Sequence, residues 1–115
     1  MSRKTHSGLG AIRRAHARAF AALGDATRLS LVAKLCRGEA YSISELTAGL
    51  KLTRQAVTKH LRVLQSAGIV SSARAGRRNL FELEPKPIEE MKNHLDFVSE
   101  QWDQALSRLR LLVEK

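Results

Sequence analysis

The chain has 115 residues, a net charge of +9 at pH 7 and a single cysteine, which excludes an intramolecular disulfide and is typical of a reducing compartment. This length suffices for one small domain with a modest core, close to the size at which association between copies adds stability. No apolar run resembles a signal peptide or reaches the roughly 20 residues of a membrane helix, so we expect a cytoplasmic protein with no membrane partner.

The N-terminal part of the chain is predicted to hold two helices after a flexible arm. Residues 1–10 are rich in Ser, Thr, Gly and basic side chains and predict a flexible basic arm, with a single domain over residues 11–115. Apolar side chains at helical spacing indicate a first helix over about residues 11–23. Asp25 is a typical N-cap for a second helix over about residues 26–36. The side chains expected to face the core from this second helix are Leu29, Val32, Ala33 and Leu35.

The middle of the chain predicts a helix-turn-helix unit over about residues 42–67. Ser42 or Ser44 is expected to cap a short helix over about residues 45–50. Thr53 is expected to cap a longer helix that stops before Gly68. The segment Gly49-Leu-Lys-Leu52 between them has the length of the turn in helix-turn-helix units.

The longer helix has two different sides. Its apolar positions, Val57, Leu61 and Leu64, recur at helical spacing and are expected to face the core. The opposite side is basic and rich in amide and hydroxyl groups, with Gln55, Thr58, Lys59 and Arg62. This combination is typical of a helix that recognises DNA.

After Gly68 the pattern predicts a β-hairpin. Two short strands, over residues 69–74 and 79–83, flank the segment Ala75-Gly-Arg-Arg78, so the tip of the hairpin is basic. A helix-turn-helix followed by a basic hairpin is a winged helix. We therefore predict a mainly α fold with a small β-hairpin, the wing spanning about residues 69–83.

The C-terminal helix is expected to pair two copies of the chain. Pro85 and Pro87 end the second strand and start a helix over about residues 88–113. A helix roughly 37 Å long is more than so small a domain can cover, so we favour a homodimer interface over packing against the chain's own core. The apolar seam has spacings of three and four residues and consists of Ile88, Met91, Leu95, Val98, Trp102, Ala105, Leu109 and Leu112.

The positive charge is concentrated in the helix-turn-helix and the hairpin. Residues 46–81 hold seven Lys or Arg and no acidic residue, whereas residues 82–115 hold five basic and eight acidic ones. A segregated basic surface is typical of phosphate binding, although a basic surface that only aids solubility is the alternative.

These features predict a set of DNA contacts. Gln55 suits a bidentate contact with adenine, Arg54 or Lys59 suits guanine, and Thr58 suits a base or a thymine methyl group. Phosphates are the expected partners of Arg62 and Lys51, while the wing tip is expected to meet the backbone or a minor groove. The complete predicted DNA-binding set is Lys51, Thr53, Arg54, Gln55, Thr58, Lys59, Arg62, Arg77 and Arg78.

From about Phe20 onward the chain resembles the ArsR-type winged-helix repressors. The resemblance lies in Leu23-Gly-Asp-Ala-Thr-Arg28, Ile43-Ser-Glu-Leu46, Gln55-Ala-Val-Thr-Lys-His-Leu-Arg-Val-Leu64, Ala67-Gly-Ile-Val70 and Gly76-Arg-Arg78. It implies a dimeric bacterial transcription regulator that usually represses its own operon. A dimer in turn predicts an inverted-repeat operator on double-stranded DNA. Such a repressor leaves DNA when an effector binds, and the sequence does not indicate which effector.

Several functions find no support in the residues. The cysteine pair and the Asp-x-His of the family's metal sensors are missing, and none of His6, His16, His60 and His94 forms a pair with metal-ligand spacing, so we expect no metal and no cofactor. No catalytic residue set is evident, and we expect no enzyme. Cys36 is expected to be a small core residue rather than a redox sensor. The alternatives to the repressor are a nucleic-acid-binding protein without sequence preference and a protein-interaction module built on the C-terminal helix.

Overall fold

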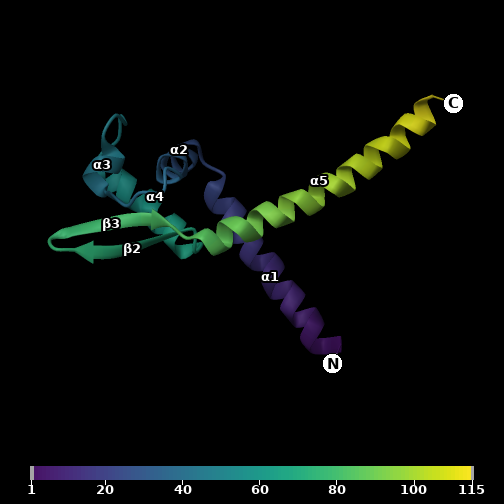
Figure 1. Cartoon of the computed structure of the whole chain (residues 1–115), viewed down its shortest axis with the longest axis horizontal. Coiled ribbons are helices and arrows are strands. Elements are labelled where there is room, and N and C mark those ends of the chain that lie inside the picture. The colour runs from purple at the N-terminus through teal and green to yellow at the C-terminus, as the bar shows by residue number, and fades with distance from the viewer. Residues whose placement is uncertain (1, 115) are drawn as a thin grey trace.

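The computed structural model describes the backbone of residues 2–114 and the side chains of residues 13–114. Five helices and three strands make up this part of the chain (Figure 1). The fold is mainly helical with a small antiparallel sheet, which confirms the predicted fold class. In chain order the elements are α1 (Ser2–Leu23), α2 (Ala26–Leu35), β1 (Tyr41–Ser42), α3 (Ile43–Thr47), α4 (Arg54–Ser66), β2 (Val70–Ala75), β3 (Arg78–Leu83) and α5 (Pro85–Val113).

The helix ends follow the capping residues. Asp25 caps α2 by accepting a hydrogen bond from the Arg28 backbone N–H, and Thr53 caps α4 by accepting one from the Ala56 N–H at 3.1 Å. Of the two serines considered for α3, Ser42 is the cap, so this helix begins two residues earlier than expected.

The end of α4 is fixed by a glycine. Gly68 has a φ of +78°, and its N–H donates to the Gln65 carbonyl. The next N–H, from Ile69, donates to the Leu64 carbonyl, which completes a Schellman motif. Both Ile69 and Leu64 are fully buried, so this stop signal also packs the start of the hairpin onto the core.

The wing is a three-stranded sheet rather than a simple hairpin. The strand order is β1-β3-β2, with Tyr41 opposite Phe81 and Val70 opposite Leu83. The hairpin turn has Gly76 at its first central position with a φ of +65°, a conformation that favours glycine. The sequence did not predict β1, because two residues are too few to show an alternating pattern.

The core lies between α4 and the sheet. Val57, Leu61 and Leu64 have no exposed surface, which confirms the apolar stripe predicted for the longer helix. They belong to one core cluster, to which every other element of the described chain also contributes side chains. The remaining buried apolar residues are Ala19, Ala22, Leu31, Leu35, Tyr41, Leu46, Ile69, Val70, Phe81 and Met91.

The face that α2 presents to the core overlaps only in part with the predicted one, because Leu35 is buried and Val32 packs against the core as expected. Leu31 and Leu35 are buried, whereas Leu29 is 52% exposed and Ala33 is also exposed. Apolar residues surround most of this helix, so helical spacing alone did not select one face. Cys36, directly after α2, also lies at the surface, so the prediction of a buried core cysteine was wrong.

Helices α1 and α5 are both longer than expected. Helix α1 begins at Ser2 and α5 at Pro85, where the prolines occupy its first turn. The side chains of residues 1–12 lie outside the described part, and the flexible arm over residues 1–10 stays a prediction. In the described residues, no helix is long and apolar enough to cross a membrane.

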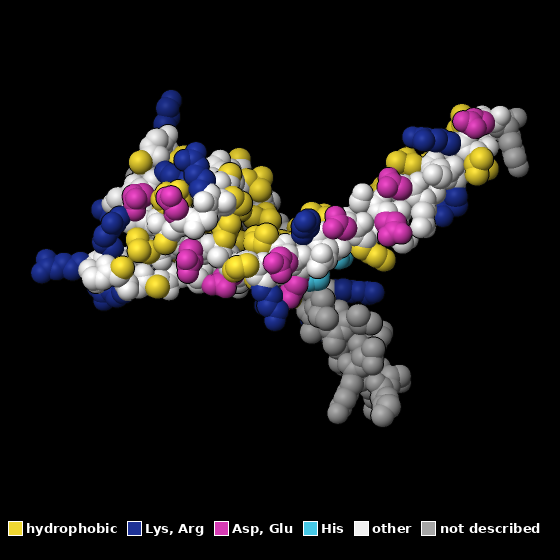
Figure 2. Space-filling model, viewed as in Figure 1, with side chains coloured by type: hydrophobic (Ala, Val, Ile, Leu, Met, Phe, Trp, Pro, Cys, Tyr) yellow, Lys and Arg dark blue, Asp and Glu magenta, His cyan; other side chains and the backbone are white. Residues whose placement is uncertain are grey.

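Helix α5 projects far from the rest of the molecule. It crosses α1 near its own start and then continues alone, with apolar side chains visible along its length (Figures 1 and 2). The radius of gyration is 18.6 Å, against about 13 Å for a compact chain of this length. The chain therefore leaves much of one helix without an internal packing partner.

Candidate nucleic-acid interface

One open hollow gathers most of the side chains predicted to contact bases. Helix α4 contributes Arg54, Gln55, Thr58, Lys59 and Arg62, and α3 contributes Ile43. These residues share the exposed side of α4, because its other side carries the fully buried stripe. The surface on this side therefore presents five hydrogen-bonding or charged side chains around a partly apolar floor, which is suited to the edges of base pairs.

A second hollow lies between α3, the start of α4 and the wing, and we call it the wing cleft. Its lining includes three arginines, Arg54, Arg77 and Arg78, together with Glu45 from α3. Arg54 borders both hollows, so the wing cleft continues directly from the exposed side of α4. Figure 2 shows Lys and Arg side chains projecting around the end of the molecule that holds α3 and the wing.

Three of the predicted contact residues lie differently from the rest. Lys51 and Thr53 are exposed in the turn before α4 but line neither hollow. The Thr53 side chain accepts the capping hydrogen bond, and the Thr58 hydroxyl donates to the Arg54 carbonyl at 2.7 Å. The Thr58 hydroxyl therefore already uses its proton within the helix.

The two wing-tip arginines are not equivalent. Arg77 is exposed in the turn between the strands. Arg78 forms an ion pair with Glu45, with 2.5 Å between Nη2 and Oε1. The sequence did not reveal this pair. Arg78 lies in the acid-free stretch of residues 46–81, whereas Glu45 directly precedes that stretch and belongs to a different element, so no sequence pattern links the two.

Glu45 also completes the cap of α3. Its Oε1 accepts a hydrogen bond from the Ser42 backbone N–H at 3.0 Å, while the Ser42 hydroxyl accepts one from the Glu45 N–H. The Ser42 backbone N–H is the main cause of a lowered pKa of Glu45, and the Ser42 side chain and Arg78 add to the effect. The carboxylate is thus held in its charged form beside the arginines.

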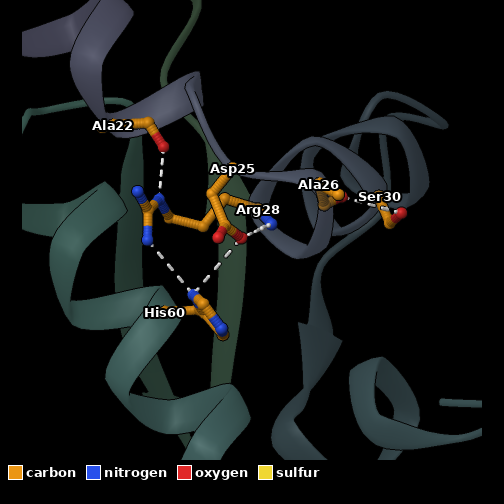
Figure 3. Close-up of polar contacts among 6 residues, drawn as sticks. All are labelled: Ala22, Asp25, Ala26, Arg28, Ser30 and His60. Carbon is orange, nitrogen blue, oxygen red and sulfur yellow. Dashed lines mark hydrogen bonds and ion pairs between the residues drawn. The ribbon is translucent and has the colours of Figure 1, made fainter. Parts of the chain in front are cut away.

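A second polar cluster connects α4 to the corner between α1 and α2 (Figure 3). Arg28 donates through Nε to the Ala22 carbonyl at the end of α1, and its Nη1 lies 3.3 Å from His60 Nδ1 on α4. Asp25 Oδ2 lies 3.8 Å from the same His60 nitrogen. His60 therefore holds the position of α4 from its inner edge and does not point toward the two hollows.

Two other histidines meet where α1 crosses α5. The rings of His16 and His94 have centroids 5.3 Å apart, and His16 Nε2 lies 3.9 Å from Glu90 Oε2. This pair is a tertiary contact, so sequence spacing gave no sign of it. Among the residues the structure describes, no group of three or more His, Cys, Asp or Glu side chains is placed to hold a metal ion. The side chain of His6 lies outside those residues.

The predicted dimer seam is covered at its start and open beyond it. Met91 is 4% exposed, Ile88 is half-buried, and both join the core. Farther along α5 the seam is largely exposed, with Val98 and Ala105 half-buried. The exposed seam residues are Leu95, Trp102, Leu109 and Leu112.

A helix-turn-helix whose outer side adjoins a basic three-stranded wing defines a winged helix-turn-helix DNA-binding domain. Residues 25–72 match the family model described as bacterial regulatory protein, arsR family. The chain is 34% identical over 97 residues to the HTH-type transcriptional regulator Rv2034 of Mycobacterium tuberculosis. The matched region covers 84% of this chain and 87% of that protein. The chain belongs to the ArsR family of DNA-binding transcriptional regulators, as its sequence motifs indicated.

Solved structures show the same fold. The ArsR-like transcriptional regulator from Rhodococcus sp. RHA1 superposes with a TM-score of 0.72 at 31% identity, over 87% of this chain and 93% of that one. The homodimeric winged helix-turn-helix domain Mb0332 from Mycobacterium bovis has a TM-score of 0.63 at 20% identity, over 86% and 88%. Because the family consists of transcriptional regulators, the expectation that the chain is not an enzyme is confirmed.

Proposed function

We propose that the protein is a dimeric repressor that binds an inverted-repeat operator with two copies of α4 and leaves it when an effector binds. The observation that carries this proposal is the placement of the α4 hollow and the wing cleft side by side on one basic surface. In this proposal α4 enters the major groove, and the wing meets the adjacent backbone or minor groove. The repressor role follows from the family resemblance.

Within this arrangement the side chains of α4 have different partners. Gln55 pairs with an adenine, and Arg54 or Lys59 pairs with a guanine. Arg62, Lys51 and the wing arginines contact phosphates, which fix the register of the protein on the duplex without specifying sequence. The hollow at the exposed side of α4 supports the proposed base contacts, because Arg54, Gln55 and Lys59 border it together.

The dimer is supported by the open part of the α5 seam. Four large apolar side chains there are at least 54% exposed in the single chain, although a soluble domain seldom leaves such a continuous surface uncovered. A second copy, related by a two-fold axis, would bury this surface and place two α4 helices on successive turns of the duplex. The homodimeric state of the M. bovis domain, which shares the fold, agrees with this proposal.

A single substitution tests the role of the α4 surface. Gln55→Ala removes the bidentate contact and should weaken binding to an inverted repeat from upstream of the protein's own gene by about 1–3 kcal/mol. It should also relax the preference for one base at one position of each half-site. Fluorescence anisotropy with the repeat and with its single-base variants measures both effects.

The matched control is the same substitution at the other end of the same helix. Gln65 borders neither hollow and donates to the Ser72 hydroxyl at 3.0 Å, so Gln65→Ala should leave base preference unchanged. If Gln55→Ala also leaves affinity and preference unchanged, α4 does not contact bases as proposed. If the wild-type protein binds unrelated duplex equally well, a nucleic-acid-binding protein without sequence preference replaces the repressor.

A further inference from the structure

The wing cleft combines strong positive charge with one negative group. Three guanidinium groups from two separate elements line a hollow of about 350 Å³, which is large enough for a phosphate group. Glu45 is the acidic residue among the lining side chains, and it contacts Arg78. In the described part of the chain, neither Arg54 nor Arg77 has a carboxylate within ion-pair distance. The cleft is therefore suited to an anion but already holds a carboxylate.

The position of Glu45 is fixed from within α3. One oxygen, Oε1, accepts hydrogen bonds from both the Ser42 N–H and Arg78. The Ser42 contact belongs to the capping box, so it holds the carboxylate at the cleft whether or not Arg78 is present. Arg78 stands on the wing and reaches Glu45 across the cleft.

We propose that the wing cleft binds one backbone phosphate of the DNA duplex, and that Glu45 occupies Arg78 until this phosphate displaces it. This inference rests on the proposed function, because the phosphate belongs to the duplex that α4 contacts. Arg78 exchanges a carboxylate for a phosphate, while Arg54 and Arg77 complete the charge around the phosphate. Glu45 then lowers the affinity for DNA without contacting a base.

The energetics of surface charges favour this exchange. The Glu45 and Arg78 side chains are 47% and 59% exposed, and ion pairs between such exposed groups contribute little stability. A phosphate in the cleft would meet three guanidinium groups, each able to donate two parallel hydrogen bonds to it. The exchange should therefore cost only the small free energy of breaking the Glu45–Arg78 ion pair. This cost reduces the affinity for every duplex by the same amount, whatever its sequence.

The test uses Glu45→Gln, which removes the charge and keeps the cap. Glutamine serves at this position of a capping box, so the variant should fold as the wild type does. We expect it to bind both the inverted repeat and a duplex of unrelated sequence about two- to fivefold more tightly, with base preference unchanged. The slope of log affinity against log salt concentration should become steeper by up to about one unit.

A second substitution separates exchange from a purely structural ion pair. Arg78→Ala should weaken DNA binding more in the Glu45→Gln background than in the wild type, because in the wild type breaking the ion pair offsets part of the phosphate contact. The control is Glu82→Gln, which changes the net charge by the same amount as Glu45→Gln. Glu82 lies on β3, the strand that carries Arg78, but about 13 Å farther along it, so this substitution should change the affinity for DNA much less.

Two outcomes would overturn the inference. If Glu45→Gln binds DNA no more tightly than the wild type, the ion pair persists in the complex and only positions the wing. If Arg78→Ala has no effect in either background, Arg78 contacts no phosphate. Both results require wild-type protein that prefers its own inverted repeat over unrelated duplex. Absence of that preference would instead overturn the proposed function.

Discussion

Residues 26–83 and the outer half of α5 differ in whether their apolar side chains are covered within the single chain. In the first region, α4 packs three fully buried side chains against the sheet and its neighbouring helices. In the second, Trp102, Leu109 and Leu112 remain 63%, 56% and 71% exposed. The first region completes its core within one chain, whereas the second needs a surface that this chain does not supply.

This difference assigns separate tasks to the two regions. A self-contained core can hold the α4 surface and the wing cleft at a fixed spacing, and a precise spacing is what contacts with a duplex require. An uncovered apolar helix can instead set the distance between two such units. Substitutions in the first region should thus change folding, and substitutions in the second should change assembly.

The largest effect on folding is expected in the core of α4. Leu61 is fully buried, so Leu61→Ala should lower the free energy of unfolding by about 2–5 kcal/mol through lost burial and the cavity left behind. Leu29→Ala on α2 is the matched control, and it should cost about 1 kcal/mol or less because Leu29 is 52% exposed. Denaturant titration at a fixed protein concentration measures both. Equal costs would contradict the described faces of α2 and α4.

The next effect concerns assembly. Leu109→Glu places a charge on the proposed dimer seam and should yield monomers at concentrations where the wild type is dimeric. Affinity for the inverted repeat should fall by roughly a hundredfold, because a monomer presents one α4 instead of two. Sedimentation and DNA titration measure the two consequences.

The control for this variant lies on the same helix. Ser107→Glu adds the same charge at an exposed position two residues away from Leu109, on another side of α5. It should leave both dimerisation and DNA affinity near the wild-type values. If Leu109→Glu stays dimeric, the seam is not the interface, and a partner other than a second copy covers it.

Much of the fold could be predicted because its signals are local. Asp25 and Thr53 cap helices where expected, and Gly68 and Gly76 take the left-handed conformations that end α4 and turn the hairpin. Each signal depends on residues within a few positions of one another. The predicted α4 side chains also meet at one hollow, because a helix with one buried stripe exposes the other side.

The features that escaped prediction depend on contacts between distant segments. Strand β1 exists because Tyr41 pairs with Phe81, and Glu45 meets Arg78 only because α3 and the wing lie on either side of the wing cleft. Likewise, His60 on α4 is held by Arg28 from the first turn of α2. None of these pairings leaves a periodic pattern along the chain, so they become visible only once the elements are placed in space.

The smallest expected effect is a pH dependence of folding through Asp25. The hydrogen bond from the Arg28 N–H is the main cause of the lowered pKa of Asp25, and the charge of Arg28 lowers it further. A lowered pKa in the folded state means that this stabilisation is present above the unfolded pKa of about 3.9 and is lost as the pH falls through the folded value.

Asp25→Asn keeps an N-cap of similar quality without the charge. The stability difference between wild type and variant should be constant from about pH 5 to 7 and shrink below about pH 4, as urea titrations at each pH would show. A difference that persists unchanged at pH 3 would mean that the Asp25 charge does not stabilise the corner between α1, α2 and α4.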